Sequence, residues 1–240
     1  MVERFYSETP TPQVTSANEI TAASLIQAHA EAMGGDKAVG RIDLLRFSGS
    51  VFKGDEILTF EGTSSRSDRF SVVLSDRDSQ RLIQPEGFQQ MASLVRLGAS
   101  QSHNDYLLFA LGSIFADFEN LAHHHPFVGR KHILSVEPDK FGKKGLLCVT
   151  LEMSPDTSSI LYLNEDSMRL EERRDLRDGE VTATYRYSDY EPVNGVPLPH
   201  SVVAQISGYE PVRLHFRSLR AADPSSENKM SEGLARHDIN

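Results

Sequence analysis

Hydrophobic and polar residues alternate with a period of two along most of the chain, which is the pattern of β-strands that bury one face. The first clear run contains Leu45, Phe47 and Val51 between polar or small residues, and similar runs recur as far as Phe216. Turn residues separate successive runs at intervals of roughly 8 to 15 residues, a spacing typical of strands joined by hairpins. The pattern therefore predicts an antiparallel meander and not a parallel sheet with helical crossovers.

Two segments instead follow the 3.6-residue period of an amphipathic helix. The first, at residues 16–34, begins with capping-box spacing and ends at a glycine. The second, at about residues 104–121, is more apolar, and phenylalanines widen its hydrophobic face. Packing such a helix on the sheet buries the apolar stripe of the helix and the apolar face of the strands together. We therefore predict an α+β fold, in which a single curved antiparallel sheet carries at least one helix on its concave face.

The segment at residues 185–200 combines three tyrosines, three prolines and an Asn-Gly pair. Asn194-Gly195 is the dipeptide preferred where both central residues of a hairpin turn need a positive φ, so the segment predicts a β-hairpin. Pro197 and Pro199 lie two residues apart, and their missing N–H groups would therefore face the same side of the returning strand. We expect that side of the strand to lack a paired neighbour at this point.

The same region resembles a known protein family. A strand ending in "YSDY", followed by "PVNGVPLPH" and preceded by "ILYLNEDSMRLEERRDLRDGEVTATY", resembles the C-terminal half of the LolA/LolB-like superfamily of bacterial lipoprotein carriers, especially its lipoprotein-sorting-like members. The order of elements is similar too, with an N-terminal helix ending in "AMGG", a run of strands, a middle helix and further strands over about residues 22–219. The resemblance implies a strongly curved half-barrel whose helices close its concave side over an apolar cavity, which in the carriers takes acyl chains.

Residues that would line such a cavity lie on the apolar stripe of the middle helix or of a predicted strand. We select Phe47, Phe60, Val72, Leu111, Phe115, Phe118 and Val149. Which face of each strand looks inward is not decided by the alternation alone, because a shift of one residue reverses both faces. The same side chains could fill an ordinary core, as apolar stripes commonly do.

Length and composition indicate one main domain. With 240 residues, of which 39% are hydrophobic, we expect a folded unit at residues 16–220, a flexible linker at residues 1–15 and a flexible tail at residues 221–240. The excess of 34 acidic over 25 basic residues, without a dense Lys/Arg stripe, argues against nucleic acid as a partner. No apolar stretch approaches the roughly 20 residues needed to cross a bilayer, so no transmembrane segment is expected.

The N-terminus lacks the basic start and apolar core of a secretion signal. We expect a periplasmic location, with the signal peptide absent from this sequence, and a cytoplasmic location stays open.

Candidate chemistry is sparse. The three histidines at residues 123–125 lack the i, i+4 spacing of zinc hydrolases, so we expect no metal there, and no cofactor elsewhere. Arg173, Arg174 and Arg177 lie in a charged run and could form a docking patch for an acidic partner. No spacing suggests a nucleophile, a base and an oxyanion donor brought together, so we expect no catalytic residues and no enzyme.

The expected function is therefore non-enzymatic binding of a lipid or lipoprotein acyl chain. This binding could serve transport across the bacterial envelope and could involve an envelope protein partner. A periplasmic sensor or adaptor that binds a protein partner with its cavity filled is the alternative, and a cytoplasmic scaffold without a cavity also stays open.

Overall fold

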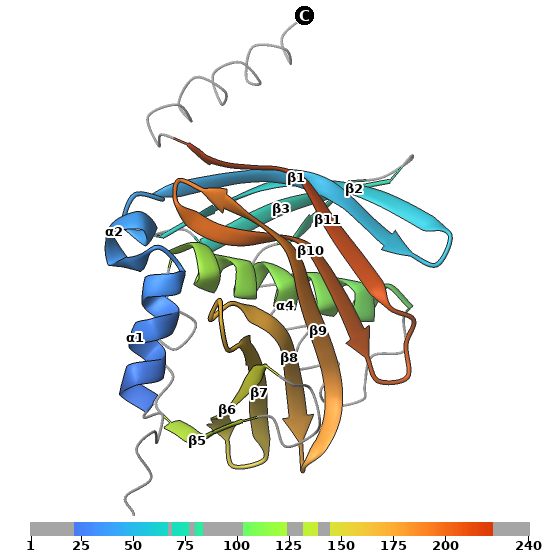
Figure 1. The fold of residues 1–240 in the computed structure, drawn as a ribbon. Coiled ribbons are helices and arrows are strands. Elements are labelled where there is room, and N and C mark those ends of the chain that lie inside the picture. The colour runs from blue at the N-terminus through green and yellow to red at the C-terminus, as the bar shows by residue number, and fades with distance from the viewer. Residues whose placement is uncertain are drawn as a thin grey trace, which may run out of the picture.

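One antiparallel sheet dominates the structure, which is a computed structural model that describes residues 22–66, 69–76, 80–83, 103–123, 132–138 and 145–222. The described strands are ordered β4-β3-β2-β1-β11-β10-β9-β8-β7-β6-β5 in a single sheet of eleven strands (Figure 1). Every neighbouring pair is adjacent in sequence except β1 and β11, so the predicted meander is confirmed. The sheet is not closed, because β4 and β5 stand at its two ends.

The first part of the chain forms α1 (Ala22–Ala32), α2 (Gly35–Val39), β1 (Leu44–Lys53), β2 (Glu56–Ser65), β3 (Arg69–Ser75), β4 (Gln80–Ile83) and α4 (His103–His123). The second part forms β5 (His132–Pro138), β6 (Leu146–Ser154), β7 (Thr157–Asn164), β8 (Leu170–Arg177), β9 (Glu180–Val193), β10 (Val196–Ile206) and β11 (Val212–Ala222).

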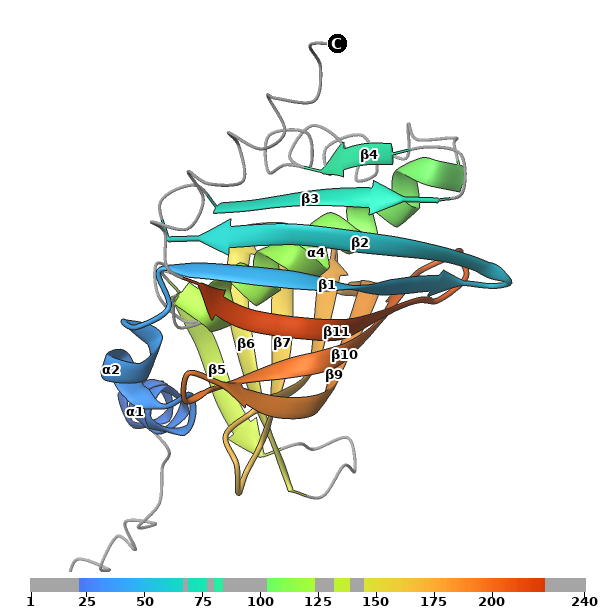
Figure 2. The ribbon, with the colours of Figure 1, turned by 90° about the horizontal axis from the view of Figure 1, so that it is seen from above.

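Helix α4 lies on the concave face of the sheet. In Figure 1 it runs between β1–β3 on one side and β6–β8 on the other, and Figure 2 shows that β1–β3 pass over the helix when the molecule is seen from above. Its closest backbone neighbours are β2, β3 and β10. The predicted α+β half-barrel with a helix on its concave face is confirmed, and the predicted helix at about residues 104–121 differs from α4 by no more than two residues at either end.

Helix α1 ends close to the predicted glycine. Gly34 adopts a φ of 91°, a left-handed conformation that stops an α-helix, and the short α2 follows it. A side chain at Gly34 would place its Cβ 2.5 Å from the carbonyl oxygen of Gly195, so the glycine also allows close packing against the β9–β10 turn. Residues 16–21 of the predicted first helix lie outside the described residues, and α2 was not predicted.

The predicted hairpin joins β9 to β10. Asn194 and Gly195 have φ values of 51° and 89°, the pair of positive angles expected of this turn. Strand β10 pairs with β9 from Val196 onward, whereas β11 pairs with β10 only between Ser201 and Ala204. Among the described strands, the stretch that contains the two prolines therefore has a neighbour on one side only, as predicted.

Candidate ligand-binding site between α4 and the sheet

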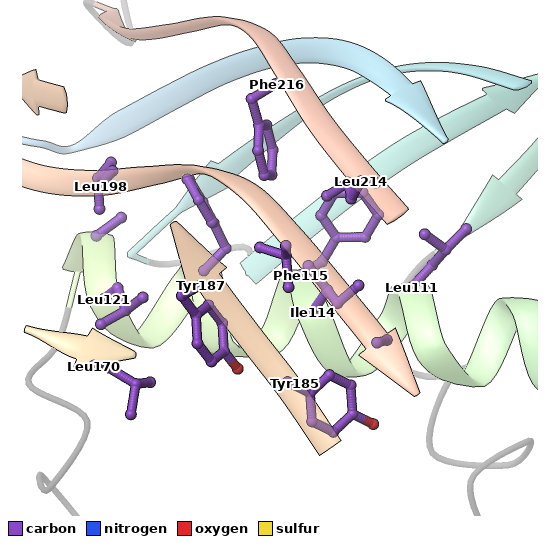
Figure 3. Close-up of a cluster of buried hydrophobic side chains, with 14 of the residues drawn as sticks. Leu111, Ile114, Phe115, Leu121, Leu170, Tyr185, Tyr187, Leu198, Leu214 and Phe216 are labelled. Carbon is purple, nitrogen blue, oxygen red and sulfur yellow. The ribbon is translucent and has the colours of Figure 1, made fainter. Parts of the chain in front are cut away.

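All seven residues selected from the sequence are buried in one continuous hydrophobic cluster. They come from β1, β2, β3, β6 and α4, and none exposes more than 4% of its surface. The cluster also contains side chains of β9, β10 and β11, some of which are drawn in Figure 3. The strand residues among them therefore lie on buried faces of the sheet, and whether the seven residues line a ligand cavity stays a prediction.

Phe115 lies among the aromatic side chains of this cluster. Its ring centroid is 5.4 Å from that of Phe47 and 5.6 Å from that of Phe60, and it is 5.9 Å from Phe70 and 6.4 Å from Phe216. One of these pairs is stacked and two are T-shaped, and such arrangements favour aromatic pairs beyond the burial of their area. Phe70 and Phe216 were not selected from the sequence, although both lie on the alternating strands.

Glycines on β1 and β2 make room for the rings. Phe47 is paired with Gly62 across the two strands, and Gly49 is paired with Phe60. A Cβ on Gly62 would lie 2.7 Å from the Phe47 ring and 2.5 Å from the carbonyl oxygen of Ser71. Contacts this short do not occur between real atoms, so the position of the Phe47 ring depends on the missing side chain of Gly62.

A polar cluster lies on the side of α4 that faces β8 and β9. Arg173 of β8 donates hydrogen bonds from Nη1 to Asp117 Oδ1 and from Nη2 to Ser113 Oγ, the latter at 2.6 Å. Nη2 also donates to Asp175 Oδ2 at 3.1 Å, and the hydroxyl of Tyr187 donates to the second oxygen of Asp117. Ser113 and Asp117 are four residues apart and share one helix face, while Arg173 and Asp175 share one strand face. These residues join α4 to β8 and β9 by charge and hydrogen bonds.

This burial of Arg173 corrects the predicted docking patch. Only 7% of the Arg173 side chain is exposed, and it faces α4. Arg174 lies on the opposite face of the strand, where it pairs with Glu172 at 2.6 Å. Arg177 is 4.0 Å from Asp156 near the β8–β9 turn. The three arginines therefore share no surface, and the prediction of a common docking patch is wrong.

Electrostatics keep the guanidinium of Arg173 and the phenols of Tyr185 and Tyr187 protonated at neutral pH. Burial opposes the charge of Arg173, but Asp117 and Asp175 outweigh that effect and raise the pKa of its guanidinium above the ordinary value. Burial, together with the charge of Asp117, raises the pKa of Tyr187. Burial also raises the pKa of Tyr185, and the charge of Arg173 offsets this only in part. Both phenols are therefore hydrogen-bond donors at neutral pH.

The three histidines at residues 123–125 cannot be placed as a site. His123 is the last residue of α4, and the side chains of all three lie outside the described residues. The expectation that they bind no metal stays a prediction. Elsewhere in the described part of the chain, no group of three or more His, Cys, Asp or Glu residues is arranged to hold a metal ion.

Within the residues that the structure describes, no helix has both the length and the apolar character needed to cross a membrane.

Comparison with known proteins identifies structural relatives only. No family model matches the chain, and no curated protein matches it. A LolA superfamily protein from Nitrosomonas europaea is 13% identical with a TM-score of 0.47, over 86% of this chain and 96% of that one. A protein domain from Vibrio parahaemolyticus assigned to outer membrane lipoprotein sorting is 12% identical with a TM-score of 0.48, over 87% and 97%. A DUF1329 family protein from Desulfovibrio piger is 12% identical with a TM-score of 0.46, over 84% and 93%.

The chain is thus similar to a LolA-superfamily protein and to a lipoprotein-sorting domain of known structure. Function has to be inferred from the side chains of this chain.

Proposed function

We propose that the protein binds a lipid or a lipoprotein acyl chain, without catalysis, between α4 and the concave face of the sheet. The observation that carries this proposal is the single buried cluster that the predicted lining residues form around α4 inside an open sheet. Helix α4 is held to β8 and β9 by a compact polar cluster and not by apolar packing alone. An apolar chain could therefore enter the aromatic half of the interior while those polar contacts stay in place.

The energies of ring packing and of chain burial favour such entry. Each specific aromatic pair contributes about 0.5–1.5 kcal/mol beyond its buried area. Burial of an acyl chain contributes about 0.8 kcal/mol per methylene, or about 8 kcal/mol for a chain of roughly ten methylenes. Rings that rotate away from one another would stay buried against the acyl chain. Only the contribution of their specific pairing would therefore be lost, and not that of their buried area. The free energy lost when a few ring pairs separate is therefore smaller than the free energy gained when the acyl chain is buried.

The setting of this function follows the resemblance of the sequence to lipoprotein carriers. We place the protein in the periplasm, where it would carry its ligand across the bacterial envelope and meet an envelope protein partner. The functional unit in this proposal is the predicted domain at residues 16–220, extended to Ala222, where β11 ends.

One observation favours the alternative of a sensor or adaptor with a filled interior. Phe118 stacks on Phe216 with 4.4 Å between ring centroids, and Phe47 stacks on Phe115 at 5.4 Å, which is the packing of an ordinary core. In that case the ligand would be a protein bound on the outside of the sheet, and the interior would admit no acyl chain.

A tryptophan reporter distinguishes the two functions. The chain contains no tryptophan, so Phe115→Trp would supply a single fluorophore at the proposed site. Ile57, which is 62% exposed, gives the matched control variant Ile57→Trp. A brominated twelve- to eighteen-carbon acyl ligand quenches a tryptophan that it touches. We expect saturable quenching of the tryptophan at position 115 and little quenching of that at position 57. Equal quenching of both variants, or quenching of neither, would contradict acyl binding at this site.

A further inference from the structure

The polar cluster contains two buried hydrogen-bond donors that its own residues do not use. Within the described part of the chain, neither the hydroxyl proton of Tyr185 nor the Nε–H of Arg173 has an acceptor, and the oxygen of Tyr185 interacts only with Ser113, which lowers its pKa. The guanidinium of Arg173 lies over the Tyr185 ring, with 4.1 Å between its Cζ and the ring centroid, so the two groups are neighbours. An unpaired buried donor is unfavourable by about 1–3 kcal/mol, and folded proteins contain few of them. The pair is therefore suited to bind an acceptor.

The chemistry of both groups defines that acceptor. Arginine has only donor hydrogens, and the raised pKa of Tyr185, caused by burial, keeps its phenol protonated at neutral pH. A ligand at this position must therefore present a hydrogen-bond acceptor oxygen.

The charge of the cluster indicates that this acceptor is neutral. Asp117 and Asp175 both accept hydrogen bonds from Arg173, so two carboxylates face one guanidinium and leave one excess negative charge. A third anion would be repelled by the two carboxylates, and the positive charge of Arg173 is already balanced. A neutral carbonyl oxygen accepts hydrogen bonds without adding charge.

The apolar surroundings indicate what carries the carbonyl. Tyr185 belongs to the same hydrophobic cluster as Phe115, and Figure 3 shows Tyr185 and Tyr187 on one strand, both among the side chains of that cluster. A chain that contacts the aromatic rings and continues around α4 toward β9 could therefore end with its carbonyl at the Tyr185 hydroxyl. Esters and amides of fatty acids provide such a neutral carbonyl, whereas a free fatty acid is ionised at neutral pH.

We propose that Tyr185 and Arg173 form a recognition site for the neutral carbonyl of an ester- or amide-linked acyl chain, and that this site selects acylated ligands over free fatty acids. The inference rests on the proposed function, because the chain itself must occupy the cluster around Phe115.

The test compares three ligands with twelve-carbon chains on the wild type and on two variants that each lack one tyrosine hydroxyl. The neutral fluorophore N-phenyl-1-naphthylamine is bound first and is then displaced by monododecanoylglycerol, by dodecanoate or by dodecanol, which lacks the carbonyl. Tyr185→Phe removes the hydroxyl but keeps the ring beneath Arg173, and its unfolding midpoint should fall less than that of Tyr187→Phe, because only the interaction with Ser113 is lost. Tyr187→Phe is the matched control, since it removes a hydroxyl that bonds Asp117.

The wild-type protein should prefer the ester to both other ligands. Tyr185→Phe should lose about five- to tenfold in ester affinity, as expected for one hydrogen bond, and keep its affinity for dodecanol. Tyr187→Phe should unfold earlier but keep the ester preference. Equal affinity for ester and dodecanoate, or an unchanged ester affinity in Tyr185→Phe, would overturn the carbonyl site while leaving acyl binding intact. Failure of the wild type to bind the fluorophore or any of the three ligands would overturn both.

Discussion

Replacement of Asp117 by alanine tests the buried polar cluster most sharply. The side chains of Asp117 and Arg173 are 8% and 7% exposed, so solvent screens their interaction little. Removing one partner of a buried ion pair destabilises a protein by about 3–5 kcal/mol, because the other charge is left buried. Here Asp175 stays 3.1 Å from Arg173 and compensates part of that charge. We therefore expect a loss of about 3 kcal/mol, near the lower end of the range.

This loss corresponds to a fall in the unfolding midpoint of about 6–12 °C for a domain of this size. The assay is urea and thermal unfolding followed by far-ultraviolet circular dichroism. Arg177→Ala is the control, because its ion pair is exposed and 4.0 Å long, and it should change stability by less than about 1 kcal/mol. The double variant Asp117→Ala/Arg173→Met removes both charges and should recover part of the loss. A loss below about 1 kcal/mol for Asp117→Ala, or a double variant as unstable as the sum of its single variants, would refute the buried pair.

Two further predictions concern Gly62 and the buried phenols. Gly62→Ala should destabilise the protein by about 1–3 kcal/mol in urea unfolding, because its Cβ would meet the Ser71 carbonyl at 2.5 Å, whereas Glu61→Ala on the same strand should be nearly neutral. Equal effects of the two variants would show that the ring packing tolerates a side chain there. Burial raises the pKa of Tyr185 and Tyr187 above the ordinary 10.0, so their contribution to stability is complete below pH 10 and is lost as pH rises through the folded-state pKa values. The urea midpoint of the wild type should therefore fall between pH 10 and about 12 more steeply than that of Tyr185→Phe/Tyr187→Phe, and parallel curves would contradict this assignment.

Local patterns were sufficient to predict most of the elements. The alternation of apolar residues predicted β9 and β10, and Asn194-Gly195 fixed the turn between them because its positive φ values are a property of those two residues. The 3.6-residue period of apolar residues predicted α4, because this pattern too is contained within the segment itself. Strand β4 was missed, because four residues are too few to establish a period. The pairing of β1 with β11 joins the two ends of the domain, and no local pattern specifies such a contact.

The candidate site was predictable only in its apolar part. Phe47, Phe60 and Phe115 were selected because each lies on an apolar stripe. Such stripes are buried whatever the detailed arrangement of the helices and strands. Arg173 was interpreted as a surface residue, because a charged side chain is buried only when a partner compensates it. That partner, Asp117, lies 56 residues earlier in the chain, and the sequence carries no signal that links the two. The burial of Arg173 therefore depends on how α4 packs inside the sheet.

The central claim is that an acyl ligand occupies the interior between α4 and the sheet. It is tested most directly by mass spectrometry of organic extracts from protein that was purified from bacteria without detergent, with the extracted lipid quantified against protein. Phe115→Asp, which places a charge in the aromatic cluster, serves as the comparison. The account predicts an acyl lipid at a near-stoichiometric amount in the wild type and its loss in a Phe115→Asp variant that remains folded. Wild-type protein that carries no acyl lipid and takes none up when dodecanoyl esters are added would contradict the account.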